Sequence, residues 1–79
     1  NTVKNIKFDI IFLDPPYKEE FALDAIEKIS NLQLLKYDGI IIIETDEPER
    51  DINRINNMNI NYKIYDLRKY GRVSLIFLK

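Results

Sequence analysis

The sequence predicts an α/β fold built on a mostly parallel sheet. A strand is expected over residues 8–13 and another over 40–43, and their apolar runs, residues 10–13 and 40–43, have the continuous hydrophobicity of strands that are covered on both faces. Apolar residues between them recur at helical spacing, which indicates a strand–helix–strand unit whose strands are parallel and whose crossover is right-handed. With 79 residues and no internal repeat, the chain is at most one small domain.

The first helix is expected over residues 19–32. Asp38 and Gly39 then form a predicted turn, and Ile40–Ile43 forms the second strand. The apolar side of the helix is a single stripe, as expected for a helix packed on a sheet, made of Phe21, Ala22, Ala25, Ile26, Ile29 and Leu32.

A weaker helix is predicted over residues 49–57, where Ile52 and Ile55 are its apolar points. Residues 62–68 alternate as a strand, with Tyr62 and Ile64 on one face and Lys63, Tyr65 and Leu67 on the other. Tyr70-Gly71 is a turn into a last strand over 73–78, and so short a turn joins antiparallel neighbours. The layout is therefore β-α-β-α-β-β, parallel except for the last strand.

The strand at 8–13 is too apolar for a sheet edge. We therefore expect its other neighbours to belong to sequence outside residues 1–79, and the start at Asn1 rather than Met suggests a processed, trimmed or partial chain. The expected partners are the N-terminal half of the same fold or, when that half is absent, a second copy of the chain.

Composition limits the chemistry that the chain can perform. There is no Cys and no His, so disulfides, thiolate metal sites and a histidine base are excluded, and no metal is expected. No apolar stretch reaches the ~20 residues of a membrane span, and a cytoplasmic protein without membrane contact is the expectation. The formal net charge is −1, but it hides a basic segment from Tyr62 to Lys79.

The first strand ends in Asp14-Pro15-Pro16-Tyr17, at the sheet edge where open parallel sheets bind ligands. The Asp14 carboxylate can accept a hydrogen bond from the exocyclic amine of a planar ring. Pro16 holds Pro15 extended, so the Pro15 carbonyl can accept a second one. Tyr17 offers a stacking face worth about 1–3 kcal/mol per base, which suits a flipped-out nucleobase. The alternative is that the two prolines form only a turn that ends the strand.

The stretch FDIIFLDPPY at 8–17 resembles motif IV, the (Asp/Asn)-Pro-Pro-(Tyr/Phe) signature of S-adenosylmethionine-dependent amino-methyltransferases. With Asp in the first position it most resembles the RsmD type, the bacterial small-subunit rRNA guanine-N2 methyltransferases. The stretches LLKYDGIIIIE at 34–44 and RKYGRVSLIFLK at 68–79 agree with that family. The resemblance implies the C-terminal half of a seven-stranded, Rossmann-like (class I) methyltransferase fold, whose final strand is antiparallel.

The resemblance also implies a function. Asp14, Pro15, Pro16 and Tyr17 would be the catalytic residues that transfer a methyl group from S-adenosylmethionine to guanine, with Asp14 also at the edge of the cofactor pocket. The family's glycine-rich cofactor loop is missing, since neither of the two glycines, Gly39 and Gly71, lies in such a loop. Residues 1–79 are thus expected to be a partial domain, inactive alone.

Three basic residues, Arg68, Lys69 and Arg72, surround the predicted last turn. The strand before this turn runs parallel to the strand before Asp14, so the turn lies at the ligand edge. Contact with RNA phosphates is one interpretation, and rRNA or a small-subunit assembly intermediate would be the partner. The other interpretation is a solvated hairpin tip.

Several alternatives stay open from the sequence. The same tetrapeptide serves DNA or RNA adenine-N6 methyltransferases, and the chain is alternatively a non-catalytic fragment or assembly module. Glu44 is either a structural acid or part of a pocket wall, and Tyr70 either belongs to the core or stacks on RNA. The acidic residues from Asp46 to Asp51 are expected to form a solvated loop and helix start.

Overall fold

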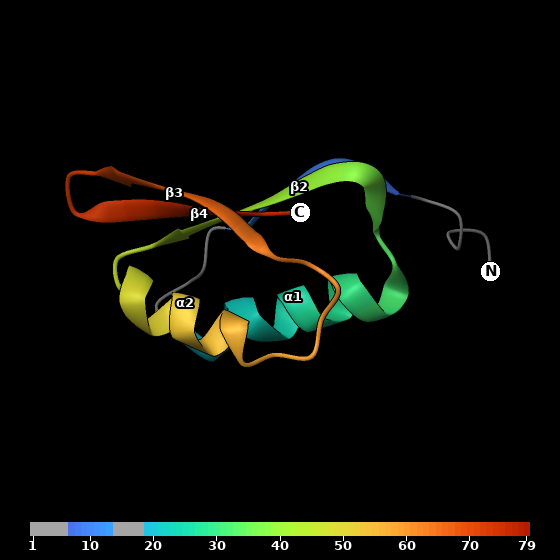
Figure 1. The fold of residues 1–79 in the computed structure, drawn as a ribbon, viewed down its shortest axis with the longest axis horizontal. Coiled ribbons are helices and arrows are strands. Elements are labelled where there is room, and N and C mark those ends of the chain that lie inside the picture. Colours follow the sequence, from blue (N-terminus) through green and yellow to red (C-terminus); the bar gives the residue numbers. More distant parts are fainter. Residues whose placement is uncertain (1–6, 14–18) are drawn as a thin grey trace.

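Two layers, a sheet and a pair of helices, make up the structure, a computed structural model that describes residues 7–13 and 19–79 (Figure 1). Both helices lie on the same side of the sheet. The elements in chain order are β1 (Phe8–Leu13), α1 (Glu19–Leu32), β2 (Leu35–Thr45), α2 (Pro48–Asn56), β3 (Ile64–Tyr70) and β4 (Val73–Leu78).

The sheet has four strands in the order β1-β2-β4-β3. β1 pairs with β2 in parallel, and β4 is antiparallel to both β2 and β3. Three strands therefore point the same way and the last one opposes them, which confirms the predicted layout. As a result, the carboxyl ends of β1 and β2 and the β3–β4 turn lie at one edge of the sheet, seen at the left of Figure 1.

The core lies between the sheet and the helices. The pleat of β2 sends Ile41 and Ile43 to the helix side, where both are buried. From α1, Ile26 and Ile29 pack into the same layer as the stripe predicts, whereas Leu32 at the helix end is exposed. Burying each such side chain contributes about 1.5–3 kcal/mol. The buried apolar cluster comprises Ile26, Ile29, Leu35, Ile41, Ile43, Ile55, Ile76 and Leu78.

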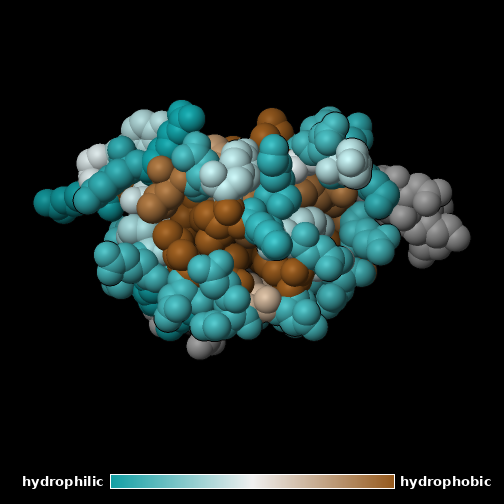
Figure 2. Space-filling model, viewed as in Figure 1, coloured by the Kyte–Doolittle hydropathy of each residue, from teal (hydrophilic) through white to brown (hydrophobic). Residues whose placement is uncertain are grey.

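Hydrophobic residues also remain accessible between the two layers, as Figure 2 shows in the middle of its view. Partly buried residues of the segment after α2, including Met58 and Ile60, pack against the core from outside. Neither described helix is long and apolar enough to cross a membrane.

No described helix covers the other face of the sheet, which we call the open face. The alternate residues of three strands point to it: Ile10 and Phe12 from β1, Ile40 and Ile42 from β2, and Leu75 and Phe77 from β4. Ile10 is 60% exposed and Phe12 is 53% exposed, because β1 lies at the sheet edge with β2 as its one described neighbour. The apolar runs of β1 and β2 led to the prediction that both faces of these strands are covered. In the described residues, helices cover one face only.

The predicted turn at Asp38-Gly39 is wrong, because β2 runs through it. The β1–β2 register passes from Phe8↔Leu35 to Ile10↔Ile40, so β2 carries extra residues here, a local irregularity rather than a chain reversal. A Cβ on Gly39 would lie 2.6 Å from Cδ1 of Leu35. Glycine is thus needed for close approach of the Leu35 side chain.

A second irregularity falls in β3, between Ile64 and Asp66. Tyr65 is the extra residue, and its ring packs on Phe77 with centroids 6.0 Å apart, on the open face. Beyond this bulge the alternation is reversed, so Leu67 pairs with the buried Ile76 on the helix side. The expectation that Tyr65 and Leu67 share a face is therefore wrong.

We predict that the 79-residue chain self-associates through the open face and the β1 edge, since an apolar strand with unpaired backbone groups invites pairing. Phe12→Lys should shift the chain toward monomer in analytical ultracentrifugation. Tyr37→Lys is the matched control, because Tyr37 is also aromatic but fully exposed at 100%. A monomeric parent chain, or equal effects of both variants, would contradict this.

Candidate functional site

The predicted motif Asp14-Pro15-Pro16-Tyr17 lies outside the described residues, and its roles stay a prediction. Its position along the chain is nevertheless informative. β1 ends at Leu13, which pairs with Ile43 two residues before the end of β2. The motif therefore follows directly from the carboxyl edge of the sheet.

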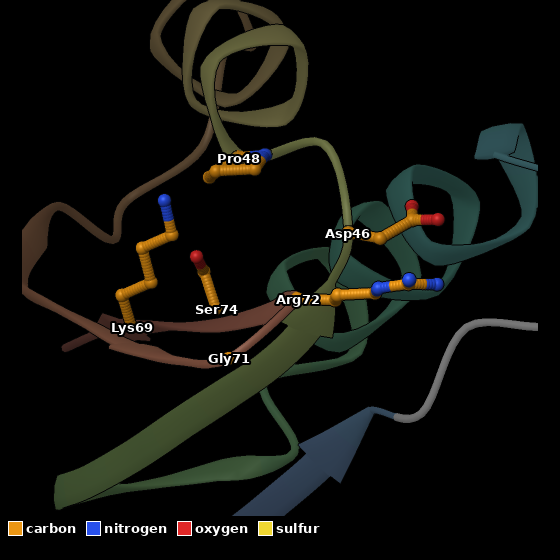
Figure 3. A pocket seen from close by; sticks show the side chains of 6 residues that line it. All are labelled: Asp46, Pro48, Lys69, Gly71, Arg72 and Ser74. Carbon is orange, nitrogen blue, oxygen red and sulfur yellow. The ribbon is translucent and has the colours of Figure 1, made fainter.

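A pocket of about 470 Å³ opens at the same edge (Figure 3). It lies between the loop that joins β2 to α2 and the turn of the β3–β4 hairpin, and we call it the hairpin pocket. Its lining residues are Asp46, Pro48, Lys69, Gly71, Arg72 and Ser74.

Lys69 and Ser74 enter the hairpin pocket from paired positions on β3 and β4. They share the helix side of the hairpin with Leu67 and Ile76, because side chains alternate along each strand. Ser74 is only 2% exposed. In Figure 3 its hydroxyl points into the space between Lys69 and Pro48.

The charged lining of the pocket is positive overall. Lys69 and Arg72 contribute two positive charges and Asp46 one negative charge, which leaves a net charge of +1. The Arg72 and Asp46 side chains extend to the same side, away from Lys69 (Figure 3). The ammonium group of Lys69 therefore dominates the part of the pocket that Ser74 lines.

A buried hydrogen-bond network fixes the loop between β2 and α2. The Thr45 hydroxyl donates to Oδ2 of Asp51 at 2.5 Å and accepts from the backbone N–H of Glu47 at 2.9 Å. Nε of Arg50 donates to Oδ1 of Asp51 at 3.0 Å. One hydroxyl thus ties the end of β2 to the first turn of α2, and this sets where Pro48 meets the pocket.

The expectation that all the acids from Asp46 to Asp51 are solvated is wrong for Asp51, which is 7% exposed. Asp46, Glu47 and Glu49 are exposed, as predicted. The sequence did hold a signal for the difference, since Asp51 precedes the buried Ile55 by four residues and so shares its helix face.

Arg68 does not join Lys69 and Arg72, because it lies on the open face. Its Nε donates to Oδ2 of Asp66 at 3.0 Å, and its guanidinium carbon lies 5.9 Å from the centre of the Phe77 ring. The hydrogen bond to Asp66, followed by one with Tyr70, raises the pKa of Arg68. The three basic residues predicted as one cluster are thus divided between two faces of the hairpin.

The two residues that the sequence left open now have positions. Tyr70 is 54% exposed, so it does not belong to the core. Glu44 is half-buried and pairs with Leu75, with both side chains on the open face. Neither residue lines the hairpin pocket.

This arrangement of strands and helices is the C-terminal half of a Rossmann-like methyltransferase fold. The chain belongs to the family described as conserved hypothetical protein 95, an RsmD-like family, whose match spans residues 1–79. No curated protein matches the chain.

Solved structures with this arrangement include the "putative methylase HI0767" of Haemophilus influenzae, at 27% identity and a TM-score of 0.66, which matches over 94% of this chain and 44% of that one. A "conserved hypothetical protein" of Streptococcus pyogenes has 24% identity, a TM-score of 0.68 and coverages of 92% and 43%. The "putative methyltransferase yhhF" of Escherichia coli has 18% identity, a TM-score of 0.67 and coverages of 95% and 40%. The chain thus spans less than half the length of each.

We predict that Asp51→Asn destabilises the folded state by about 1–3 kcal/mol, the cost of leaving buried hydrogen-bonding groups poorly paired. The measurement is urea unfolding of the complete protein. Asp46→Asn is the matched control, since exposed Asp46 should change stability by no more than about 0.5 kcal/mol. A small effect of Asp51→Asn would mean that the Thr45 network does not hold the loop.

Proposed function

We propose that this chain is the acceptor-binding half of an S-adenosylmethionine-dependent methyltransferase that modifies the exocyclic amine of guanine in rRNA. One observation carries the proposal: Asp14-Pro15-Pro16-Tyr17 directly follows β1 at the carboxyl edge of the sheet. Membership of an RsmD-like family over the whole chain supports it, as does the likeness to a structure named as a methylase.

In this proposal the motif residues bind and orient the base. The Asp14 carboxylate and the Pro15 carbonyl each accept a hydrogen bond from the guanine amine, which turns the nitrogen lone pair outward. Pro16 fixes the Pro15 backbone in the extended conformation. Tyr17 stacks on the ring and keeps the flipped base in place.

S-adenosylmethionine would supply an activated methyl group. The described residues offer it no cradle, because the Leu35 side chain occupies the space beside Gly39 and Gly71 lies in the hairpin turn. Apart from Asp14 at the edge of the cofactor pocket, we therefore assign the residues of this chain to the acceptor only. The donor would bind mainly to the N-terminal half of the fold, which would also cover the open face.

The RNA would lie across the hairpin turn. Lys69 and Arg72 supply positive charge at the carboxyl edge, and Arg68 supplies it on the opposite side of the same strand. Such contacts bind the backbone without reading its sequence. The proposed partner is rRNA or a small-subunit assembly intermediate in the cytoplasm.

Two alternatives make different predictions. An adenine-N6 methyltransferase would use the same tetrapeptide on DNA or RNA, and mass spectrometry of the methylated nucleoside distinguishes the two products. A non-catalytic assembly module would yield no methylated nucleoside with any nucleic acid.

We expect Asp14→Ala to abolish methyl transfer by the complete protein while leaving its affinity for S-adenosylmethionine largely unchanged, because Asp14 holds the acceptor amine. Transfer of a labelled methyl group to small-subunit rRNA measures the first effect and calorimetry measures the second. The matched control is Asp9→Ala at the far end of β1, where Asp9 pairs with Lys36 at 3.4 Å. Turnover by the Asp14 variant comparable to that of the parent would refute the assignment.

A further inference from the structure

We propose that the hairpin pocket is a phosphate subsite, which holds one backbone phosphate of the nucleic acid close to the target nucleotide. The inference rests on the proposed function for the identity of the polymer. It goes beyond contact with a basic surface, because it assigns the hairpin pocket, the neutral hydroxyl of Ser74 and the N-terminal end of α2 to a single phosphate group.

The Ser74 hydroxyl is the observation that points to a ligand. Ser74 as a residue is 2% exposed, and its hydroxyl makes no hydrogen bond to any other residue in the described part of the chain. Its Oγ is not sealed from solvent, so the small exposed area of the residue includes the hydroxyl at the pocket wall. Because the hydroxyl points into the pocket (Figure 3), a bound oxygen acceptor would give it the missing partner.

Lys69 supplies the charge that such an acceptor would carry. It stands beside Ser74 as its cross-strand partner, and no carboxylate of a described residue lies within salt-bridge distance of its ammonium group. By contrast, Arg68, its neighbour in sequence, is already paired with Asp66. Lys69 is therefore available to an anion in the pocket.

The N-terminus of α2 closes the pocket on the side opposite the hairpin. Pro48 lines the pocket as the first residue of the helix, and the N-cap residue Glu47 makes no side-chain capping hydrogen bond. Pro48 has no N–H, so the helix end contributes the partial positive charge of its dipole at the pocket rather than a hydrogen-bond donor, and this charge favours anions. The carboxylate of Glu47 is itself turned to Arg50, at 3.8 Å.

Together these groups suit a phosphate better than a cation or an apolar ligand. A tetrahedral oxyanion presents several acceptor oxygens. The pocket offers an ammonium group and a hydroxyl as donors from the hairpin, and the positive end of the α2 dipole from the opposite side. Its volume of about 470 Å³ falls within the 300–1,000 Å³ range of ligand pockets, so a phosphate with part of its sugar fits. The pocket opens at the same edge of the sheet as the end of β1, the strand that precedes the motif proposed to bind the base.

The test measures binding of a guanine-containing single-stranded RNA oligonucleotide to the complete protein over a range of salt concentrations. Lys69→Gln should weaken binding and reduce the log–log salt slope by about 0.7, the loss of one phosphate contact to a single strand. Ser74→Ala should weaken binding about tenfold with an unchanged slope, since a neutral donor is lost.

Two controls separate this effect from structural damage. Lys63→Gln removes the same charge from an exposed residue before β3 and should leave affinity within about twofold. Ser74→Ala should leave the unfolding midpoint unchanged or raised, because the hydroxyl has no partner to lose in the free protein. Equal affinity and slope for the parent, Lys69→Gln and Ser74→Ala proteins would overturn the subsite.

A second measurement distinguishes failure of the subsite from failure of the proposed function. Titration with inorganic phosphate, followed by NMR, should shift the amide signals of Ser74 and Glu49 in the parent but not in Ser74→Ala. A phosphate response without methylation of any nucleic acid would retain the anion site and reject the methyltransferase. If methylation and RNA binding both survive Lys69→Gln and Ser74→Ala, the methyltransferase proposal is retained and the phosphate subsite is rejected.

Discussion

The isoleucine run of β2 is the constraint on which the rest of the structure depends. β2 is the strand that joins β1 to the β3–β4 hairpin, and each of Ile41, Ile42 and Ile43 has a partner on both sides. Because side chains alternate with period two, a slip of one residue would exchange the buried and open faces of the run. The register of this one strand therefore sets the core and the position of the Thr45 loop.

Much of the fold follows from local hydrophobicity. The strands at 8–13 and 73–78 and the helix at 19–32 have the predicted bounds, because the strands are short and mostly apolar and the helix carries an apolar stripe at helical spacing. The failures occur where long-range packing decides the backbone. Gly39 looks like half of a turn but serves the approach of Leu35, and the bulge at Tyr65 depends on pairing with β4.

The candidate site likewise contains residues that the sequence suggested and residues that it did not. Charge and the expected place of the last turn at the ligand edge suggested Lys69 and Arg72, both of which line the hairpin pocket. Nothing local marks Ser74 or Thr45, because burial of a small polar residue is decided by elements distant in sequence. Asp51 is buried although the acidic residues around it in the sequence are exposed, and only its spacing from Ile55 indicates this burial.

The extra residue at Tyr65 decides which faces the two ends of β3 present. Ile64 pairs with the buried Leu78 and packs against the core, while Lys69 pairs with Ser74 in the pocket. These two residues are five positions apart, and an odd separation in a regular strand places side chains on opposite faces of the sheet. The bulge removes that conflict, so that one strand supplies an apolar side chain to the core and an ammonium group to the pocket on the same side of the sheet.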